Sequence, residues 1–201
     1  MAVTRRPAVF IDKDGTLIKD VPYNVRPELI ALYPDAAISL AALQRAGYKI
    51  IVVSNQSGVA RGIFTAEDLQ PVSDAIRDRL QPHGVNLTAI YYCPHSAVDG
   101  CYCRKPRSGM LRQAAAEHGI DLTASWMVGD ILNDVEAGNR AGCRTILIDN
   151  GNETEWLPGP HRAPFATVGS LTAAARTIIT TKHKETNHET QFAGHHLALH
   201  R

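Results

Sequence analysis

The sequence has no long hydrophobic run and no excess of either sign of charge. It contains 21 Lys and Arg against 20 Asp and Glu, which gives a formal net charge of +1. No apolar stretch approaches the roughly 20 residues that a membrane-spanning helix needs. Nucleic-acid and anionic-membrane binding usually leave basic patches or stripes, and this composition gives no such pattern. We therefore expect neither a membrane nor a nucleic acid among the partners of this protein.

Cysteine is also scarce, and a secretion signal is not apparent. After the basic start, only the four apolar residues 8–11 precede Asp12, whereas a signal peptide has an apolar region of about 7 to 15 residues. We expect a soluble cytoplasmic protein. The chain has four cysteines, and three of them lie within residues 93–103. In such a compartment, clustered cysteines indicate metal or redox chemistry before structural disulfides.

What the sequence does have is an alternation of short β-branched runs with longer helical patterns. Its 201 residues, 44% of them hydrophobic, suffice for one domain with a sizeable core. The expected strands lie at 8–11, 48–53, 87–92, 125–128, 144–148 and 165–168, and the expected helices at 35–46, 65–80, 108–118, 133–141 and 170–179. This alternation predicts an α/β fold, a Rossmann-like, doubly wound and mostly parallel sheet with helices on both faces. Right-handed crossovers then place the carboxyl ends of the strands, and the site, along one edge.

Two segments differ from this pattern. Residues 150–164 are rich in Gly, Pro and Asn and indicate a surface loop. Residues 181–201 are polar and contain five of the nine histidines, so we expect a disordered His-rich tail after a domain over residues 1–180, rather than a metal-binding tract. Nothing indicates a coiled coil, and we expect a monomer.

Polar residues follow four of the expected strands. The sets are Asp12-Lys13-Asp14-Gly15-Thr16, then Ser54 to Gly58, then the cysteine segment ending at Arg104-Lys105, and then Gly129-Asp130 with Asp134 four residues later. A single Asp after a strand is ordinarily a turn or cap residue. Four polar sets at strand ends that share one edge of a sheet indicate a ligand site instead.

The carboxylates in these sets suit a magnesium ion. Asp12 and Asp14 are separated by one residue, so in an extended chain both carboxylates point to one side. Converging carboxylates repel one another unless a hard divalent cation lies between them, and Mg²⁺ takes oxygen ligands while keeping waters for a substrate phosphate. We expect Asp130 to complete this site and Asp134 to orient Asp130 or a metal-bound water.

The same residues suit phosphoryl transfer. An Asp can act as a nucleophile and form an aspartyl-phosphate, while Ser54 and Lys105 supply donors and positive charge for the phosphoryl oxygens. Asp14 can protonate the leaving alcohol and afterwards activate the hydrolytic water. Together these sets resemble the four motifs of the haloacid-dehalogenase (HAD) superfamily, over about residues 8–150. That resemblance implies that Asp12 is the nucleophile and Asp14 the acid/base.

The cysteine segment offers three thiolates and an imidazole, from Cys93, His95, Cys101 and Cys103. This is a full tetrahedral donor set of the structural zinc type, although free cysteines or a disulfide such as Cys93–Cys101 are the alternatives. Only about fifty residues separate Ser54 from Lys105, which leaves little room for a separate cap domain. We expect a zinc-stabilised loop that fixes the direction of the adjacent Arg104 and Lys105.

A HAD domain without a cap and with this loop resembles two families, the D-glycero-D-manno-heptose 1,7-bisphosphate phosphatases and the histidinol-phosphate phosphatases. Residues 54–62, SNQSGVARG, look more like the heptose enzymes. The resemblance implies magnesium at Asp12, Asp14 and Asp130, and substrate recognition by Arg104. It also implies a substrate loop and a phosphate loop, whose expected substrate-binding residues are Asp20, Val21, Pro22, Tyr23, Asn55, Gln56 and Ser57. Arg61, Arg104 and Lys13 are further cations that can meet a second phosphate.

The leading hypothesis is therefore a Mg²⁺-dependent phosphatase that removes the C7 phosphate from a heptose 1,7-bisphosphate. A histidinol-phosphate phosphatase, or a phosphatase of another small sugar phosphate, is the alternative among enzymes. A zinc-stabilised binding module with an inactive site is the alternative from another class.

Overall fold

A single parallel sheet forms the centre of the computed structural model, which describes residues 5–198, with side chains described to residue 186. The strands are β1 (Ala8–Ile11), β2 (Lys49–Asn55), β3 (Leu87–Cys93), β4 (Trp126–Gly129), β5 (Arg144–Ile148) and β6 (Ala166–Val168). They lie in the order β3-β2-β1-β4-β5-β6, and every neighbouring pair is parallel. The predicted doubly wound, mostly parallel fold is confirmed.

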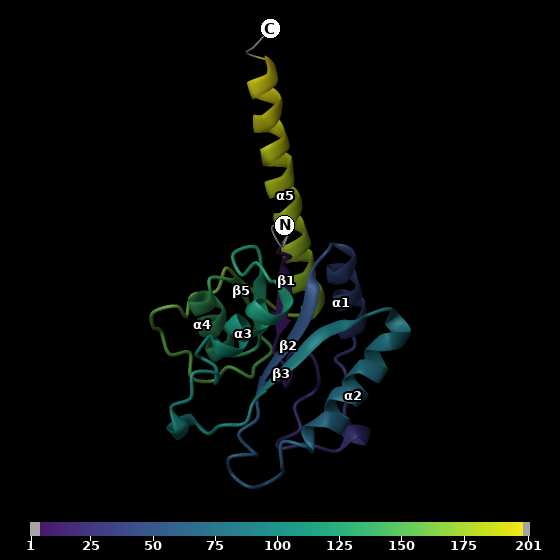
Figure 1. The fold of residues 1–201 in the computed structure, drawn as a ribbon, viewed down its shortest axis with the longest axis vertical. Coiled ribbons are helices and arrows are strands. Elements are labelled where there is room, and N and C mark those ends of the chain that lie inside the picture. The colour runs from purple at the N-terminus through teal and green to yellow at the C-terminus, as the bar shows by residue number, and fades with distance from the viewer. Residues whose placement is uncertain (1–4, 199–201) are drawn as a thin grey trace.

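Helices cover both faces of this sheet (Figure 1). They are α1 (Ala36–Arg45), α2 (Leu69–Leu80), α3 (Gly109–His118), α4 (Leu132–Ala141) and α5 (Leu171–Ala198), with short 3₁₀ turns at Pro27–Leu29, Gln81–His83 and Ala97–Asp99. One hydrophobic cluster joins the sheet to α1, α2 and α5, and a second joins the opposite face to α3 and α4.

The sequence of β1 shows why both faces are covered. Val9 and Ile11 belong to the first cluster, whereas Ala8 and Phe10 belong to the second, and all four side chains are fully buried. Successive side chains in a strand point to opposite faces, so a continuous apolar run is stable only where helices bury both sides. The same alternation, and the same conclusion, apply to Ile50–Val53 in β2.

The order of the strands also locates the site. From β1 the chain proceeds outward to β2 and β3, and then returns to the other side of β1 to form β4. The carboxyl ends of β1 and β4 are therefore the topological switch point, where open α/β sheets bind ligands. Asp12 follows β1 and Asp130 follows β4, so both lie at this point.

Two helix boundaries differ from our expectations. The helix expected from residue 65 begins at Leu69, because Pro71 lacks an N–H and is tolerated only in the first turn of a helix. Residues 65–68 instead form a turn in which Asp68 accepts a hydrogen bond of 2.7 Å from the Thr65 amide. The helix expected at 170–179 continues to Ala198, so the helix end expected near residue 179 was wrong. The division into a domain and a disordered tail stays a prediction.

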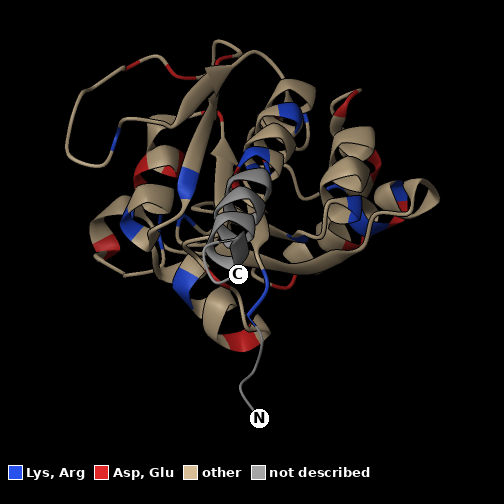
Figure 2. Ribbon diagram, turned by 90° about the horizontal axis from the view of Figure 1, so that it is seen from above, with Lys and Arg blue, Asp and Glu red and all other residues tan. Residues whose placement is uncertain are grey.

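The remaining features agree with the composition. Between Ser54 and Lys105 the structure contains only α2, β3 and short turns, so residues 5–198 include no separate cap domain. Basic and acidic residues are interspersed over the ribbon in Figure 2. Among the described residues, no helix combines the length and apolar character that crossing a membrane would require.

Candidate active site

Three buried carboxylates meet at the switch point. Asp12 follows β1, Asp130 follows β4, and Asp134 lies in the first turn of α4. One oxygen from each lies within 4.8 Å of the others. The exposed fraction is 7% for Asp12 and 0% for Asp134. The sequence predicted a magnesium site of Asp12, Asp14 and Asp130 with Asp134 beside it, whereas the structure groups Asp12 and Asp130 with Asp134 and leaves Asp14 outside.

Burial and mutual repulsion shift the titration of these groups. Burial raises the pKa of Asp12 to about 7; the Lys105 ammonium opposes this rise, whereas the charges of Asp134 and Asp14 add to it. Burial and the charge of Asp12 raise the pKa of Asp130 to about 6, against hydrogen bonds from Asn152 and Thr16. Burial also raises the pKa of Asp134. A divalent cation among these carboxylates would offset their repulsion, so the donor set fits Mg²⁺.

Lys105 is the cation already present in this cluster. Its ammonium contacts the Asp12 carboxylate, lies 2.6 Å from Asp134 Oδ1 and donates to the Val53 carbonyl at 3.0 Å. Burial disfavours the charged form of Lys105, but Asp12 and Asp134 outweigh burial and raise the pKa of the lysine. The Lys105 ammonium is therefore held in its charged form near the end of β2, beside Asp12, the expected nucleophile.

Asn55 positions the main chain of Lys105. Its side-chain amide donates to the Lys105 carbonyl at 3.0 Å, and its side-chain oxygen accepts from the Lys105 amide at 3.0 Å. The structure thus gives Asn55, which we expected to bind substrate, a contact with the loop that carries the lysine. This pair joins the end of β2 to the end of the cysteine segment.

Asp14 lies outside the cluster of three carboxylates. Its Oδ2 accepts from Gln56 Nε2 at 2.9 Å and Ser54 Oγ at 3.4 Å, and its Oδ1 lies 3.1 Å from Lys13 Nζ. We expected Asp12 and Asp14 to point to one side as in an extended strand. β1 ends at Ile11 and the chain then turns, with Gly15 at a left-handed φ of +82°, while the charge of Asp14 still acts on Asp12.

Two residues that we did not name as site residues orient Asp130. Thr16 Oγ1 donates to Asp130 Oδ1 at 2.9 Å, and Asn152 Nδ2 donates to Asp130 Oδ2 at 2.6 Å. Nearby, Asn150 Nδ2 donates to the Gly15 carbonyl at 2.7 Å. We assigned residues 150–164 to a surface loop. Their position directly after β5, at the same edge as the other polar sets, was the signal that we missed.

A pocket of about 280 Å³ opens beside Asp14. It is lined by Lys13, Asp14, residues 20–24 and residues 55–58, so the expected substrate loop and phosphate loop face one another across it. Arg61 does not line this pocket; its Nη1 donates to the Tyr23 hydroxyl at 2.8 Å, and its guanidinium lies over the Tyr23 ring.

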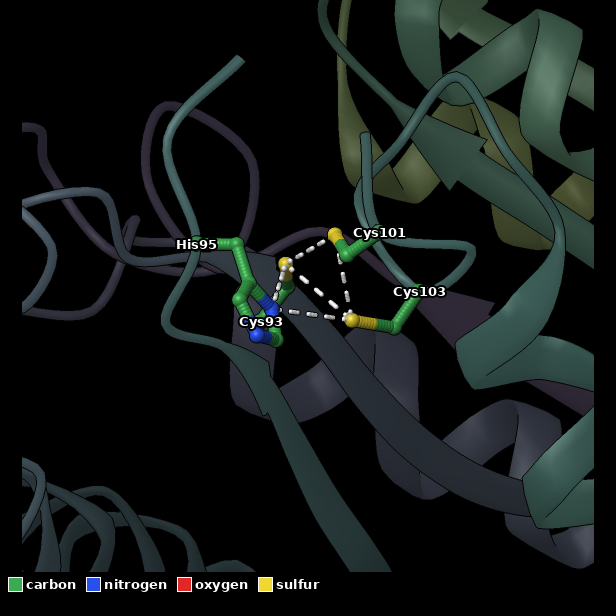
Figure 3. Close-up of side chains that lie close together, drawn as sticks. All are labelled: Cys93, His95, Cys101 and Cys103. Atoms are coloured by element: carbon green, nitrogen blue, oxygen red, sulfur yellow. Dashed lines mark hydrogen bonds between the residues drawn. The ribbon is translucent and has the colours of Figure 1, made fainter. Parts of the chain in front are cut away.

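Cys93, His95, Cys101 and Cys103 form a second compact donor cluster (Figure 3). Cys103 Sγ lies 3.3 Å from both Cys93 Sγ and His95 Nδ1, and 3.5 Å from Cys101 Sγ. Cys93 Sγ lies 3.6 Å from both His95 Nδ1 and Cys101 Sγ. A disulfide has an S–S length of about 2.05 Å, so the thiols are free. In a tetrahedral zinc site with Zn–S bonds of about 2.3 Å, two ligand sulfur atoms lie roughly 3.8 Å apart. The separations in this cluster are close to that value and suit a tetrahedral metal.

Arg104 and Lys105 follow this cluster directly. Arg104 Nη1 donates to the His95 carbonyl at 3.1 Å, which ties the arginine back to the cysteine segment. Arg104 and Lys105 both line a pocket of about 220 Å³ with Ser96, Pro106 and Arg107. Arg104 therefore lies next to the site, on the side of the cysteine cluster rather than on the side of Tyr23.

Comparison with known proteins agrees with this geometry. The HAD-hydrolase-like family matches residues 102–174. A "Probable D-glycero-D-manno-heptose-1,7-bisphosphate 7-phosphatase" of Thermoplasma volcanium is 43% identical over 61% of this chain and 84% of its own length. A "D-glycero-beta-D-manno-heptose-1,7-bisphosphate 7-phosphatase" of Pseudomonas aeruginosa is 33% identical over 87% of this chain and 98% of its own length.

A solved structure extends the likeness to the fold. The crystal structure of D,D-heptose 1,7-bisphosphate phosphatase from B. bronchiseptica, complexed with magnesium and phosphate, superposes with a TM-score of 0.74. Its sequence is 30% identical, and the match covers 87% of this chain and 99% of that one. The identity to these relatives and the coverage of most of their length show that this chain belongs to the D-glycero-D-manno-heptose-1,7-bisphosphate 7-phosphatase family of HAD phosphatases.

Proposed function

We propose that this protein is a Mg²⁺-dependent phosphatase that hydrolyses the C7 phosphate of D-glycero-D-manno-heptose 1,7-bisphosphate. The observation that carries the proposal is the buried cluster of Asp12, Asp130 and Asp134 with Lys105 at the switch point, beside a pocket lined by Asp14. The names of the relatives at 33–43% identity supply the substrate.

In this proposal Asp12 attacks the phosphorus atom and forms an aspartyl-phosphate as the bond from phosphorus to the C7 oxygen breaks. Asp14, at the pocket, gives its proton to that leaving oxygen. It then takes a proton from the water that hydrolyses the aspartyl-phosphate, which releases inorganic phosphate and restores Asp12. Ser54 and Lys105 stabilise the phosphoryl oxygens.

Asp12 and Asp130, with Asp134 beside them, would hold Mg²⁺, which would supply positive charge for the phosphoryl group. Thr16 and Asn152 keep the Asp130 carboxylate in place through one hydrogen bond to each oxygen. For Asp14 we retain the prediction of an association with magnesium, although its carboxylate lies with Gln56 and Ser54 rather than in the cluster.

The substrate requires a site for its second phosphate as well. Asp20, Val21, Pro22 and Tyr23 with Gln56 and Ser57 line the pocket and would contact the sugar. Arg61 and Arg104 are the cations that we assign to the C1 phosphate. Asn55 would act chiefly by positioning Lys105.

We further propose that Cys93, His95, Cys101 and Cys103 bind a structural zinc ion. Burial raises the pKa of Cys93 to about 12, so a metal must displace the proton of this thiol on binding. All four donors come from the protein, which leaves no open position for a water or a substrate on a tetrahedral zinc. The zinc would hold the loop that ends in Arg104 and Lys105.

Phosphate release with purified protein tests the proposal. With Mg²⁺ present, we expect hydrolysis of heptose 1,7-bisphosphate with a kcat/KM well above that for histidinol phosphate, and a preference for one of the α and β anomers. A preference for histidinol phosphate would contradict the proposed substrate but would agree with the proposed phosphatase mechanism. No hydrolysis of any of these esters would favour the inactive binding module.

A further inference from the structure

A pocket on the α3 and α4 side of the sheet gathers positive charge away from the catalytic carboxylates. It measures about 600 Å³ and shares no lining residue with the pocket beside Asp14. Four segments contribute to it: the end of the cysteine segment, α3, α4 and the loop after β5. Its lining residues, which we call the arginine pocket, are Tyr102, Arg107, Ser108, Gly109, Arg112, Asn139, Arg140 and His161. No Asp or Glu is among them.

Arg112 is held in place without a carboxylate partner. Its Nε donates to Ser108 Oγ at 3.1 Å, and its Nη2 donates to the Arg140 carbonyl at 2.7 Å. These bonds fix one edge of the guanidinium group. Among the described residues, no Asp or Glu forms an ion pair with it. Its Nη1 donates to no described protein group.

Arg107 and Arg140 are also anchored, Arg107 on two carbonyls and Arg140 on the Glu136 carboxylate. Arg107 donates through Nη1 alone, to the carbonyls of Gly100 and Cys101. Arg140 uses Nε and Nη2 on Glu136. Within the described part of the chain, Nε and Nη2 of Arg107 and Nη1 of Arg140 have no protein acceptor. Three guanidinium groups from separate segments thus reach one pocket, each with N–H groups still available.

The loop after β5 is pinned to the same pocket. Asn139 Nδ2 donates to the carbonyls of His161 at 2.8 Å and Ala163 at 2.9 Å, which fixes the backbone of His161 against α4. The side of the pocket formed by His161 is therefore fixed to α4 by hydrogen bonds to its backbone. The shape of the pocket is set partly by these backbone contacts and not only by exposed side chains.

The positive charges of these arginines repel one another. A bound anion that accepts several of their N–H bonds would offset this electrostatic repulsion. Guanidinium groups match phosphate oxygens in geometry as well as in charge, and anchoring them in advance lowers the entropy lost on binding. We propose that the arginine pocket binds the phosphate group of a small phosphate ester or of inorganic phosphate, as a second anion site distinct from the catalytic one.

The opposite rim offers a surface for the organic part of an ester. The Tyr102 side chain is 68% exposed and packs so closely on Gly109 that a Cβ there would lie 2.4 Å from the ring. Tyr102 lies between Cys101 and Cys103, so an occupant would touch the segment that ends in Lys105. The proposal does not depend on the proposed function, because binding at this pocket requires no catalysis.

Amide chemical shifts of ¹⁵N-labelled full-length protein test the proposal. Titrations would use inorganic phosphate, glucose 6-phosphate and adenosine monophosphate separately, in buffer without Mg²⁺ so that the esters stay intact. We expect saturable shifts at the amides of Tyr102, Gly109 and Asn139. Tighter binding of an ester would identify the ester as the occupant, and equal binding of inorganic phosphate would identify the free ion.

The exposed arginines allow a matched comparison. The double variant Arg112→Gln, Arg140→Gln should bind at least about tenfold more weakly at these amides, because each substitution removes charge-assisted hydrogen bonds. Arg112→Lys keeps the charge but lacks the planar fork, and it should give an intermediate affinity. Arg45→Gln, in α1 on the other face of the sheet, should bind like the parent. Absence of saturable shifts with all three probes, or equal binding by the double variant, would overturn the proposal.

Discussion

Asp130 leaves almost no space around its carboxylate. Gly15 approaches it so closely that a Cβ at this position would lie 2.1 Å from Asp130 Oδ2 and 2.5 Å from Asn152 Nδ2. Gly15 also adopts a φ of +82°, which side chains disfavour. Glycine is therefore favoured here for two reasons: its backbone φ, and the lack of space beside the Asp130 carboxylate.

A comparison of Gly15→Ala with Gly84→Ala should separate the effect on the backbone from the effect on the Asp130 carboxylate. Gly84 has a φ of +71° and nothing within 4 Å of a Cβ, so its substitution should cost only the backbone strain, about 1–2 kcal/mol. Gly15→Ala should lose at least as much stability and should also lose the stabilisation that added Mg²⁺ gives the parent. Thermal melts with and without Mg²⁺ measure both effects. Equal Mg²⁺ stabilisation in the two variants would contradict the assignment of Asp130 to the metal.

Asp12→Asn removes the proposed nucleophile at almost unchanged size. We expect kcat for phosphate release to fall by at least about 10⁴-fold, because the aspartyl-phosphate cannot form. Asp149→Asn is the matched control: Asp149 is exposed at the end of β5, its side chain makes no hydrogen bond among the described residues, and activity should be unchanged. Turnover retained by a homogeneous Asp12→Asn preparation would exclude Asp12 as the nucleophile.

At this scale the sequence located some site residues and missed others for a physical reason. Asp12 and Asp130 were predictable because each directly follows a strand, Ser54 because it lies at the end of one, and parallel strands share one edge. Lys105 lies beyond the cysteine segment that follows β3. The contacts of the Asp14 carboxylate with Gln56 and Ser54 were not predictable, because they bring together residues far apart in the sequence. Asn152 was missed because irregular segments have no periodicity from which a position can be inferred.

At the scale of elements, the cysteine segment contains the proposed zinc ligands. If zinc fixes it, Cys101→Ser should lose zinc and lower Tm by about 10 °C, roughly 3–4 kcal/mol for a domain of this size. Activity should fall as well, because Lys105 is two residues beyond Cys103. Cys143→Ala is the control, since Cys143 lies outside the cluster and should leave zinc unchanged at one equivalent. Elemental analysis and thermal melts would measure both. A full zinc equivalent in Cys101→Ser would argue against these ligands.

Glu136 connects α4 to the loop after β5. Its carboxylate accepts from Arg162 Nε at 2.8 Å and from Arg140 Nε at 2.8 Å. Burial alone would raise the pKa of Glu136, but the Arg162 and Arg140 hydrogen bonds and charges outweigh burial and hold this pKa below its ordinary value. The ionised carboxylate therefore stabilises the folded state, and protonation removes that contribution.

Glu136→Gln should consequently destabilise the protein in a pH-dependent way. At neutral pH we expect a loss of about 1–3 kcal/mol in the free energy of unfolding. A lowered pKa gives stability that is present above the unfolded value of about 4.3 and is lost as pH falls through the folded value. The difference between parent and variant should thus shrink below about pH 4. Urea unfolding at several pH values measures it, and a difference independent of pH would show that packing, not charge, is lost.

The elements themselves were largely predictable, and their ends were not. β1 and β5 lie where the apolar runs placed them, because both faces of a central strand are buried and leave an unbroken hydrophobic signal. The start of α2 depended on Pro71. The continuation of α5 beyond residue 179 includes contacts with residues far away in the sequence, from Lys182 to Ala46 and from Glu185 to Arg144. Such tertiary contacts leave no local pattern.

At the scale of the whole molecule, α5 is the last element added to the sheet. Its first turns bury Leu171, Ala174, Ala175 and Ile178 in the cluster shared with α1. Beyond these turns the contacts are thinner: Lys182 donates to the Ala46 carbonyl and lies over the Tyr48 ring, and Glu185 pairs with Arg144. The proposed catalytic residues Asp12 and Ser54 lie at the carboxyl ends of β1 and β2, whereas the Ala46 and Arg144 contacts lie at the amino ends of β2 and β5.

Two truncations would therefore define where the domain ends. Ending the chain at residue 180 removes, among the described contacts with the sheet and α1, the Lys182 hydrogen bond to Ala46, the Lys182–Tyr48 cation–π contact and the partly exposed Glu185–Arg144 ion pair. This should cost about 1–2 kcal/mol with kcat unchanged. Ending it at Ser170 also exposes the site occupied by Leu171 and Ile178, for which each large side chain is worth about 2–5 kcal/mol, and this protein should not fold stably. Urea unfolding and phosphate release measure both variants. If the protein ending at residue 180 failed to fold, the domain would have to include the helix beyond that residue, and the expected boundary at 180 would be wrong.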